Sequence, residues 1–201
     1  MRSSRNEPRT WDEALAGDSD AFVAIFDLHH DRVYRHALRM TANGHDAEDI
    51  TAGAFLELWR RRRSVRLVDD SVLPWLLVTA TNLARNLARG LRRYRALINA
   101  LPRAETTNSA ADIAVKRIEE ERIDEQLRRA LNTLSKSDAA ILALTMFEQY
   151  SPAEAAVALG ISDGAARTRL HRARTHLAAA LGTSLAGERD TTTRRSLDEH
   201  A

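Results

Sequence analysis

The chain has 201 residues, which is enough for one domain or for two small ones. It contains no cysteine, so disulfides, thiolate metal sites and thiol nucleophiles are excluded together. The formal charge is only +2, but residues 61–103 carry ten basic and two acidic groups, whereas residues 1–60 carry seven and eleven. Such clustering favours a polyanionic partner such as a nucleic acid, whatever the net charge of the whole chain.

The N-terminal segment, residues 1–17, is polar and is expected to be disordered. It lacks the apolar core of a signal peptide, and no run in the chain approaches the roughly 20 apolar residues of a membrane span. We therefore expect a cytoplasmic protein without a membrane span.

Three helices are predicted in residues 18–98, because apolar residues recur there at intervals of three, four and seven positions. The first helix begins near Asp18, the second is capped by Asp46, and the third has Pro74 in its first turn. Residues 64–73 form a loop before the third helix. The second helix has more apolar surface than one packed face requires, which fits either burial on two sides or a surface for a partner. The third helix combines an apolar stripe with a strongly basic side.

The helical periodicity stops at residues 99–111, where small polar residues and a proline indicate a linker. Helical patterns resume over residues 112–182, and residues 183–201 are expected to form a flexible tail. No segment shows the alternation of a β-strand. The predicted fold class is therefore all-α, with two small helical domains joined by a flexible linker.

The C-terminal domain contains a predicted helix–turn–helix. Ser151, Pro152 and Glu154 form a capping box at the start of its first helix. Gly160 lies where the chain must turn, and Ser162 can cap the second helix, which is the spacing of this motif. These local signals predict where both helices begin.

The second helix of this motif has an apolar face and an opposite face without acidic residues. Arginine on such a face can bond to guanine O6 and N7 in the major groove, so a DNA-reading surface is predicted. A solvated surface helix would also be rich in arginine, but the cap, the turn glycine and the apolar register all agree with the motif. The candidate DNA-binding residues here are Arg167, Thr168, Arg169, His171 and Arg172.

Several segments together resemble the extracytoplasmic-function (ECF, group 4) sigma factors, the small branch of the sigma-70 family of RNA polymerase sigma factors. Residues 47–51, 55–59, 74–77 and 82–86 resemble the promoter-melting domain of that family, and residues 169–174 resemble the domain that reads the upstream promoter element. The resemblance covers nearly the whole chain. Two motifs in this order, with a linker between them, are more specific than either alone.

The resemblance implies an alternative sigma factor, which binds core RNA polymerase and directs promoter-specific transcription initiation. Residues 18–98 would be sigma region 2 and residues 112–182 sigma region 4. Such a protein is not an enzyme and uses no cofactor. Its partners would be promoter DNA and core polymerase, through the clamp coiled coil of the largest subunit and the flap. Many relatives are held inactive by an anti-sigma factor, which no residue here identifies.

The resemblance also implies roles for individual residues of region 2. The helix from Asp46 to Arg60 would dock on polymerase, and the loop of residues 64–73 would hold a base flipped out of the minus-ten element. The polymerase-binding candidates are Asp49, Ile50, Phe55, Leu58 and Trp59. The candidates for contact with the minus-ten element are Asn82, Arg85, Asn86, Arg89, Arg92 and Arg93. The helix of Arg167 to Arg172 would read the minus-thirty-five element.

Two other functions fit parts of the sequence. A helix–turn–helix regulator that binds duplex DNA without polymerase would explain residues 151–181, but it would leave the N-terminal half unexplained. An enzyme could use the histidines and acids near residues 27–36 or a metal at residues 46–49, but neither set has a recognisable ligand spacing. Charged and solvated helix surfaces account for both sets, so neither a catalytic nor a metal site is expected.

Overall fold

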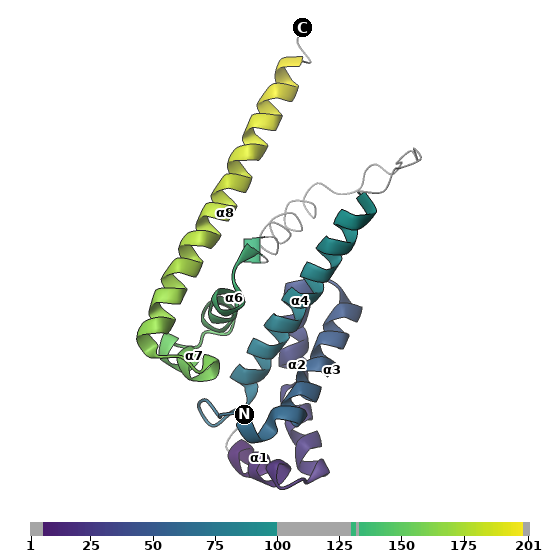
Figure 1. Cartoon of the computed structure of the whole chain (residues 1–201), viewed down its shortest axis with the longest axis vertical. Coiled ribbons are helices and arrows are strands. Elements are labelled where there is room, and N and C mark those ends of the chain that lie inside the picture. Colours follow the sequence, from purple (N-terminus) through teal and green to yellow (C-terminus); the bar gives the residue numbers. More distant parts are fainter. Residues whose placement is uncertain (1–5, 100–129, 132, 199–201) are drawn as a thin grey trace.

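The computed structural model describes residues 6–99, 130–131 and 133–198 (Figure 1). Within these ranges the regular structure is helical, and no strand is present apart from one isolated bridge between Val68 and Ser71. The all-α fold class is therefore confirmed. The predicted linker after Asn99 and the predicted helical block from 112 to 129 lie outside the described residues. No helix in the described ranges is long and apolar enough to cross a bilayer.

The N-terminal segment is helical where disorder was predicted. Helix α1 spans Glu7–Leu15, and its Trp11 and Ala14 are almost fully buried. These two side chains are three residues apart and therefore lie on the same side of the helix, which packs against α2. Over Glu7–Leu15 the chain is therefore helical and not disordered, because this apolar pair docks a short helix that has a proline in its first turn.

Three longer helices complete the N-terminal bundle, and each packs against the other two. Helix α2 spans Ser19–Thr41, α3 spans Gly44–Arg61 and continues into the short 3-10 helix η2 (Arg62–Ser64), and α4 spans Leu73–Asn99. Asp18 caps α2 as predicted, accepting hydrogen bonds from the amides of Asp20 and Ala21. The cap of α3 is Asn43 rather than Asp46, because Asn43 has an extended backbone and its side chain accepts from the Asp46 amide at 3.0 Å.

The loop between α3 and α4 is closed by a tight turn. The amide of Val68 donates to the carbonyl of Ser71 at 3.0 Å, and the amide of Ser71 donates back at 3.1 Å. Between them Asp69 and Asp70 both have left-handed backbones, with φ of 51° and 57°. This geometry is usually formed by Asn-Gly or Asp-Gly, and an ordinary L-residue in it costs about 1–2 kcal/mol. The turn is therefore strained and needs support from its surroundings.

The C-terminal half consists of α6 (Lys136–Leu142), the π-helical turn η3 (Ala143–Phe147), α7 (Pro152–Leu159) and α8 (Asp163–Asp198). The capping box of Ser151 and Glu154 is confirmed, and Gly160 ends α7 with a left-handed φ of 63°. Ser162 accepts a hydrogen bond from the Ala165 amide, as predicted for the second cap. The helix–turn–helix is therefore present.

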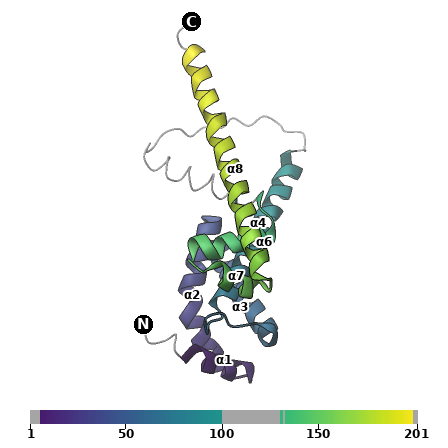
Figure 2. The same ribbon diagram turned by 90° about the vertical axis from the view of Figure 1, so that its left-hand side faces the viewer.

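Helix α8 extends away from the rest of the molecule, as Figures 1 and 2 show. It continues to Asp198, whereas a flexible tail was predicted from residue 183. The chain has no proline after Pro152, so no backbone donor is lost and the helical hydrogen bonds can continue past the packed part of the helix. The stretch for which a flexible tail was predicted is therefore helical as far as Asp198.

The two halves pack against each other along α4. Helices α6 and α7 and the turn η3 all contact α4 (Figure 1). The buried apolar side chains form one continuous cluster that includes Leu131, Leu134 and Leu144 from the C-terminal half. The structure therefore shows a closed arrangement, in which part of α4 is covered.

Candidate nucleic-acid interface

The second helix of the helix–turn–helix buries its predicted apolar face. Ala166, Leu170, Ala173 and Leu177 are at most 7% exposed, and α8 contacts both α6 and α7. The opposite side is open to solvent. Its exposed residues are Gly164, Arg167, Thr168, His171, Arg172 and Thr175. The alternation of small apolar residues and long polar ones therefore presents one convex, polar helix face.

Two arginines on this face are paired within the chain. The Arg167 Nη2 lies 2.6 Å from Asp163 Oδ2, one turn earlier on the same exposed helix. The Arg172 Nη2 lies 2.7 Å from Oδ1 of Asp138, in the first turn of α6. Burial raises the pKa of Asp138, but hydrogen bonds from Arg172 and Ser135 outweigh it and leave that pKa below its ordinary value. The Asp138 pair thus fixes the Arg172 side chain between α6 and α8.

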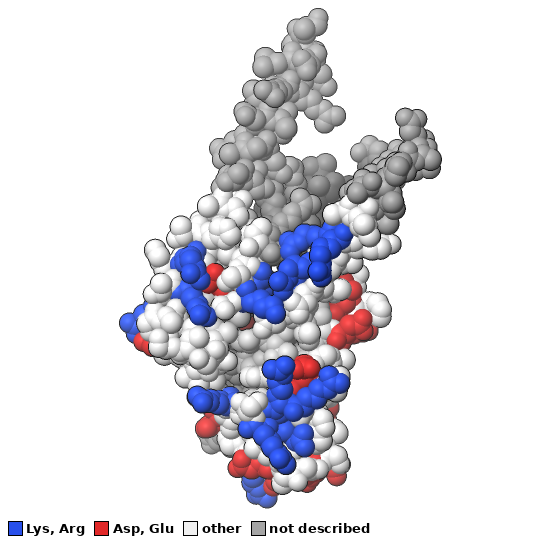
Figure 3. Space-filling model, viewed as in Figure 1, with Lys and Arg blue, Asp and Glu red and all other residues white. Residues whose placement is uncertain are grey.

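A second basic surface lies on α4. Asn86, Arg89, Arg92 and Arg93 line one shallow depression of this helix, and all four residues are exposed. The Arg89 Nη2 donates to Asn86 Oδ1 at 2.7 Å. Figure 3 shows a patch of Lys and Arg atoms over the middle of α4. Four of the six predicted minus-ten residues therefore share one solvent-facing basic surface.

Arg85 and Asn82 do not belong to that surface. Arg85 is 3% exposed and donates from Nη2 to the backbone carbonyl of Leu134. Desolvation lowers its pKa, and the nearby charges of Arg89 and Arg92 lower it further. Asn82 is half-buried, and its Oδ1 has no hydrogen-bond partner among the described residues. In this arrangement Arg85 is covered, because residues near Leu134 pack over that turn of α4.

The predicted polymerase-binding set on α3 is divided by the fold. Ile50, Phe55 and Leu58 are 5%, 4% and 0% exposed and belong to the core. These three predicted residues are therefore not on the surface, because the wide apolar side of α3 packs against both α2 and α4. Asp49 is exposed. Trp59 is half-buried, with its ring edge-on to Phe22 at 4.9 Å.

The large apolar side chain of α3 that is exposed is Leu56, which contributes to the wide apolar surface seen in the sequence but was not among the polymerase-binding candidates. Leu56 is 49% exposed and lies seven residues after Asp49, so both residues lie on the same side of the helix. On α2, Val23 is also exposed, at 55%. The sequence contained a signal for the exposure of Leu56, because this residue falls outside the apolar stripe of Ile50, Ala54 and Leu58. A helix side that mixes exposed apolar and acidic residues is suited to a protein partner rather than to DNA.

The closed arrangement has an ionic cluster that sequence reasoning also missed. Glu148 follows η3, and its carboxylate is 4% exposed. It accepts hydrogen bonds from Arg32 Nε at 3.0 Å and from Arg39 Nη2, and the buried His36 directs Nδ1 at it from 3.4 Å. Burial raises the pKa of Glu148, but the hydrogen bond from His36 and the other basic groups outweigh it, so the pKa is lowered. The cluster fastens the C-terminal half to α2.

Metal chemistry has no candidate site among the side chains that the structure describes, since no three His, Asp or Glu residues gather there. The acids and histidines near residues 27–36 are used differently. His29 bonds to Glu7 and His36 to Thr81, both inside the bundle. The features with functional potential are therefore the two basic helix surfaces and the mixed surface of α3.

Comparison with known proteins relates these surfaces to a family. The model of sigma-70 region 2 matches residues 25–94, and the model of sigma-70 region 4 matches residues 124–177. The RNA polymerase sigma factor CarQ of Myxococcus xanthus is 33% identical over 170 residues, which are 83% of this chain and 92% of that protein. The ECF RNA polymerase sigma factor SigE of Mycolicibacterium smegmatis is 34% identical over 165 residues, 80% of this chain and 63% of the relative.

The chain belongs to the ECF sigma factors. This ECF sigma factor is an alternative sigma factor for transcription initiation, and its family consists of regulators rather than enzymes. The basic surface of α4 lies in the segment matched by region 2, and the helix–turn–helix in that matched by region 4.

A solved structure has the same fold. CnrH, determined in complex with the cytosolic domain of CnrY, superimposes with a TM-score of 0.56 at 22% identity. The match covers 88% of this chain and 97% of CnrH. The resemblance extends over both halves of the sigma factor.

Proposed function

We propose that this sigma factor binds core RNA polymerase through α3 and places its two basic helix surfaces on the two elements of a promoter. The observation that carries this proposal is the position of those surfaces: one lies on α4 in region 2, the other on α8 in region 4. Arginine-rich surfaces supply the phosphate contacts that any DNA complex requires. Because promoter DNA and the polymerase are cytoplasmic, the cytoplasm is the proposed site of action.

The docking surface on polymerase is proposed to be the exposed side of α3. It includes Asp49, Leu56 and the uncovered part of Trp59, and Val23 of α2 adds a further exposed apolar side chain. Its acidic and apolar character matches a protein surface with basic and apolar groups, such as the proposed clamp coiled coil. The buried Ile50, Phe55 and Leu58 support this surface from beneath.

Recognition of the minus-ten element is proposed for α4 together with the loop before it. Asn86, Arg89, Arg92 and Arg93 supply contacts to the DNA backbone, and the turn of Asp69 and Asp70 is placed at the flipped base. Arg85 and Asn82 join them once the C-terminal half moves off α4, which polymerase binding would bring about by holding regions 2 and 4 apart. The closed arrangement is thus a resting form of the sigma factor.

The minus-thirty-five element is proposed to be read by α8. Arg172→Ala is expected to lower transcription from a cognate promoter about ten-fold, because one bidentate arginine–base contact contributes about 1–3 kcal/mol. Multi-round transcription with the reconstituted holoenzyme measures this. Asp138→Asn is the matched control, since it breaks the same ion pair but keeps the arginine. An equal loss in both variants, or the same loss on a promoter whose minus-thirty-five element is already altered, would contradict the assignment.

We also propose an inhibitory protein partner. CnrH, whose fold this chain shares, was determined in complex with the cytosolic domain of CnrY. An anti-sigma factor that stabilises the closed arrangement would keep Arg85 covered. Release of the purified complex by added core polymerase would support such a role.

One reconstitution tests the function as a whole. Core polymerase with this sigma factor is expected to give discrete start sites in run-off transcription on a genomic library, and the sigma factor alone is expected to show no specific duplex binding. Tight, specific duplex binding without polymerase would instead favour the regulator of the helix–turn–helix class. That outcome would leave the surface of α3 without a role.

A further inference from the structure

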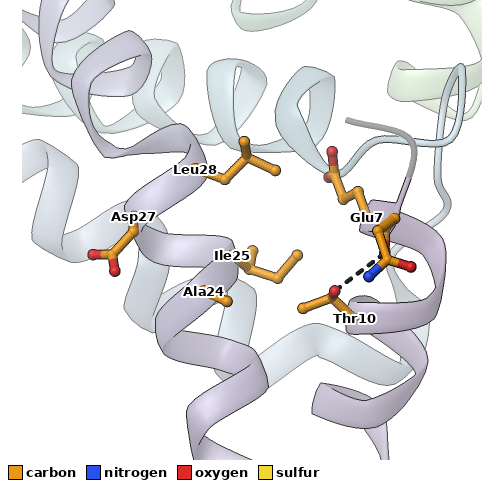
Figure 4. A pocket seen from close by; sticks show the side chains of 7 residues that line it. Glu7, Thr10, Ala24, Ile25, Asp27 and Leu28 are labelled. Carbon is orange, nitrogen blue, oxygen red and sulfur yellow. Dashed lines mark hydrogen bonds between the residues drawn. The ribbon is translucent and has the colours of Figure 1, made fainter. Parts of the chain in front are cut away.

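The carboxylate of Glu7 connects helix α1 to the loop that precedes α4. Glu7 is 2% exposed, and a single oxygen, Oε1, accepts from the Val72 amide at 2.7 Å and from Ser71 Oγ at 3.0 Å. The same oxygen lies 2.8 Å from His29 Nε2. Figure 4 shows Glu7 on α1 across an open groove from Ile25 and Leu28 of α2. The side chain therefore joins three segments that are distant in sequence.

Ser71 links Glu7 to the start of α4 through a further hydrogen bond. Its Oγ donates to Glu7 and accepts from the amide of Leu73, the first residue of α4, at 3.1 Å. The neighbouring Val68 and Val72 are 4% and 0% exposed, so both ends of the turn are anchored in the bundle. The turn, the start of α4 and the start of α1 thus form one hydrogen-bonded unit.

The two residues at the tip of the turn are acidic, which is unusual for a surface next to DNA. Asp69 and Asp70 are exposed, and both have left-handed backbones. Their carboxylates are repelled by phosphates but can accept hydrogen bonds from base amino groups, as acids do from cytosine N4. A strained, acidic tip reads a base only if it is held in one conformation, since otherwise strain and repulsion both favour its withdrawal.

We infer that Glu7 is a positioning residue for promoter recognition, which locks the Val68–Ser71 turn in the conformation that presents Asp69 and Asp70 to the minus-ten strand. This inference rests on the proposed role of the loop in reading that element. Glu7 does not touch DNA, because it is buried beneath the turn. Helix α1, a segment outside the matched range of region 2, thereby becomes part of the recognition apparatus.

The test compares Glu7→Ala with Glu13→Ala, which removes an equal charge from an exposed position on the same helix. Glu7→Gln keeps one acceptor oxygen and serves as the conservative variant. Each holoenzyme is assayed on the strongest promoter found in the run-off library and on copies with single substitutions in the minus-ten element. Affinity for core polymerase and hydrogen exchange at the Val72 amide are measured alongside.

Glu7→Ala is expected to lower transcription about ten-fold, to reduce discrimination among the minus-ten variants and to speed exchange at Val72, because about three modest hydrogen bonds are lost. Polymerase affinity should stay unchanged, Glu7→Gln should recover most of the discrimination, and Glu13→Ala should behave as wild type. Unchanged discrimination, or a loss of polymerase affinity equal to the loss of transcription, would overturn the inference.

Ser71→Ala is a second variant, which tests the inference if Glu7→Ala does not fold. It removes one donor from the loop side, so a smaller loss of discrimination is expected, and wild-type discrimination would overturn the inference. Failure of the underlying function is distinguishable: the wild-type holoenzyme itself would then not respond to minus-ten substitutions.

Discussion

Leu56→Asp is expected to abolish binding to core RNA polymerase without changing the fold, whereas Leu58→Asp is expected to unfold the N-terminal bundle. The two leucines are two residues apart on α3, but Leu56 is 49% exposed and Leu58 is 0% exposed. A charge at position 56 stays in water and removes an apolar contact with the partner. A charge at position 58 is buried without a partner. Together with the lost packing, this lowers the free energy of unfolding by more than about 4 kcal/mol.

Two measurements distinguish these outcomes: thermal unfolding followed by circular dichroism, and equilibrium binding to core polymerase. Leu97→Asp is the matched control, because Leu97 is 65% exposed on α4 and is not part of the proposed docking surface. It should keep both the melting temperature and the polymerase affinity. Normal binding by a folded Leu56→Asp variant would place the docking surface elsewhere.

Glu148→Gln is expected to weaken the closed arrangement by about 2 to 4 kcal/mol, because a buried carboxylate is lost from between three basic groups. Arg32 and Arg39 are about half exposed and can rehydrate, but His36 is fully buried and cannot. The variant should therefore populate a form in which α4 is uncovered. An unchanged interdomain distance would show that apolar packing alone holds the two halves together.

The absence of native cysteine makes this measurement direct. Ala16→Cys and Ala178→Cys place one fluorophore on each half of the molecule at exposed positions. Energy transfer between them is expected to fall in the Glu148→Gln background. Asp163→Asn, which removes a carboxylate from an exposed pair within α8, is the matched control and should leave the transfer unchanged.

Acid is expected to open the wild-type molecule in the same way. The pKa of Glu148 is lowered from its ordinary value of 4.5 in the folded protein, so folding favours the charged form. Its stabilising contribution is therefore complete above about pH 4.5 and is lost as the pH falls through the lower folded value. Energy transfer in the labelled protein should decrease over this acidic range, and the decrease should be smaller in Glu148→Gln, which has no carboxylate to protonate there.

The helix–turn–helix is an example of what the sequence determined by itself. Ser151 and Glu154 cap α7 over a distance of three residues, and Gly160 adopts the left-handed backbone that ends the helix. The apolar register of α8, from Ala166 to Leu177, follows from helical periodicity alone. Each of these features depends on neighbours within one or two helical turns. The two sigma motifs are also local sequence patterns, so their order could be recognised from the sequence.

Burial and long-range pairing were decided by the tertiary structure. Leu56 and Leu58 have the same chemistry, and the packing of α3 between α2 and α4 makes one a surface residue and the other a core residue. Arg85 lies one turn from Arg89, but contact with Leu134 buries it. Such contacts join residues that are far apart in the chain, so no local periodicity encodes them.

The same holds for the two buried carboxylates. Glu7 reaches Val72 across 65 positions, and Glu148 reaches Arg32 across 116. In the sequence each is one acid among 28 acidic residues. The local sequence determined the helix–turn–helix and the apolar faces of the longer helices, because caps and periodicity act over a few residues. Only the packed structure decided which charges are buried, because desolvation depends on which distant segments exclude water from them.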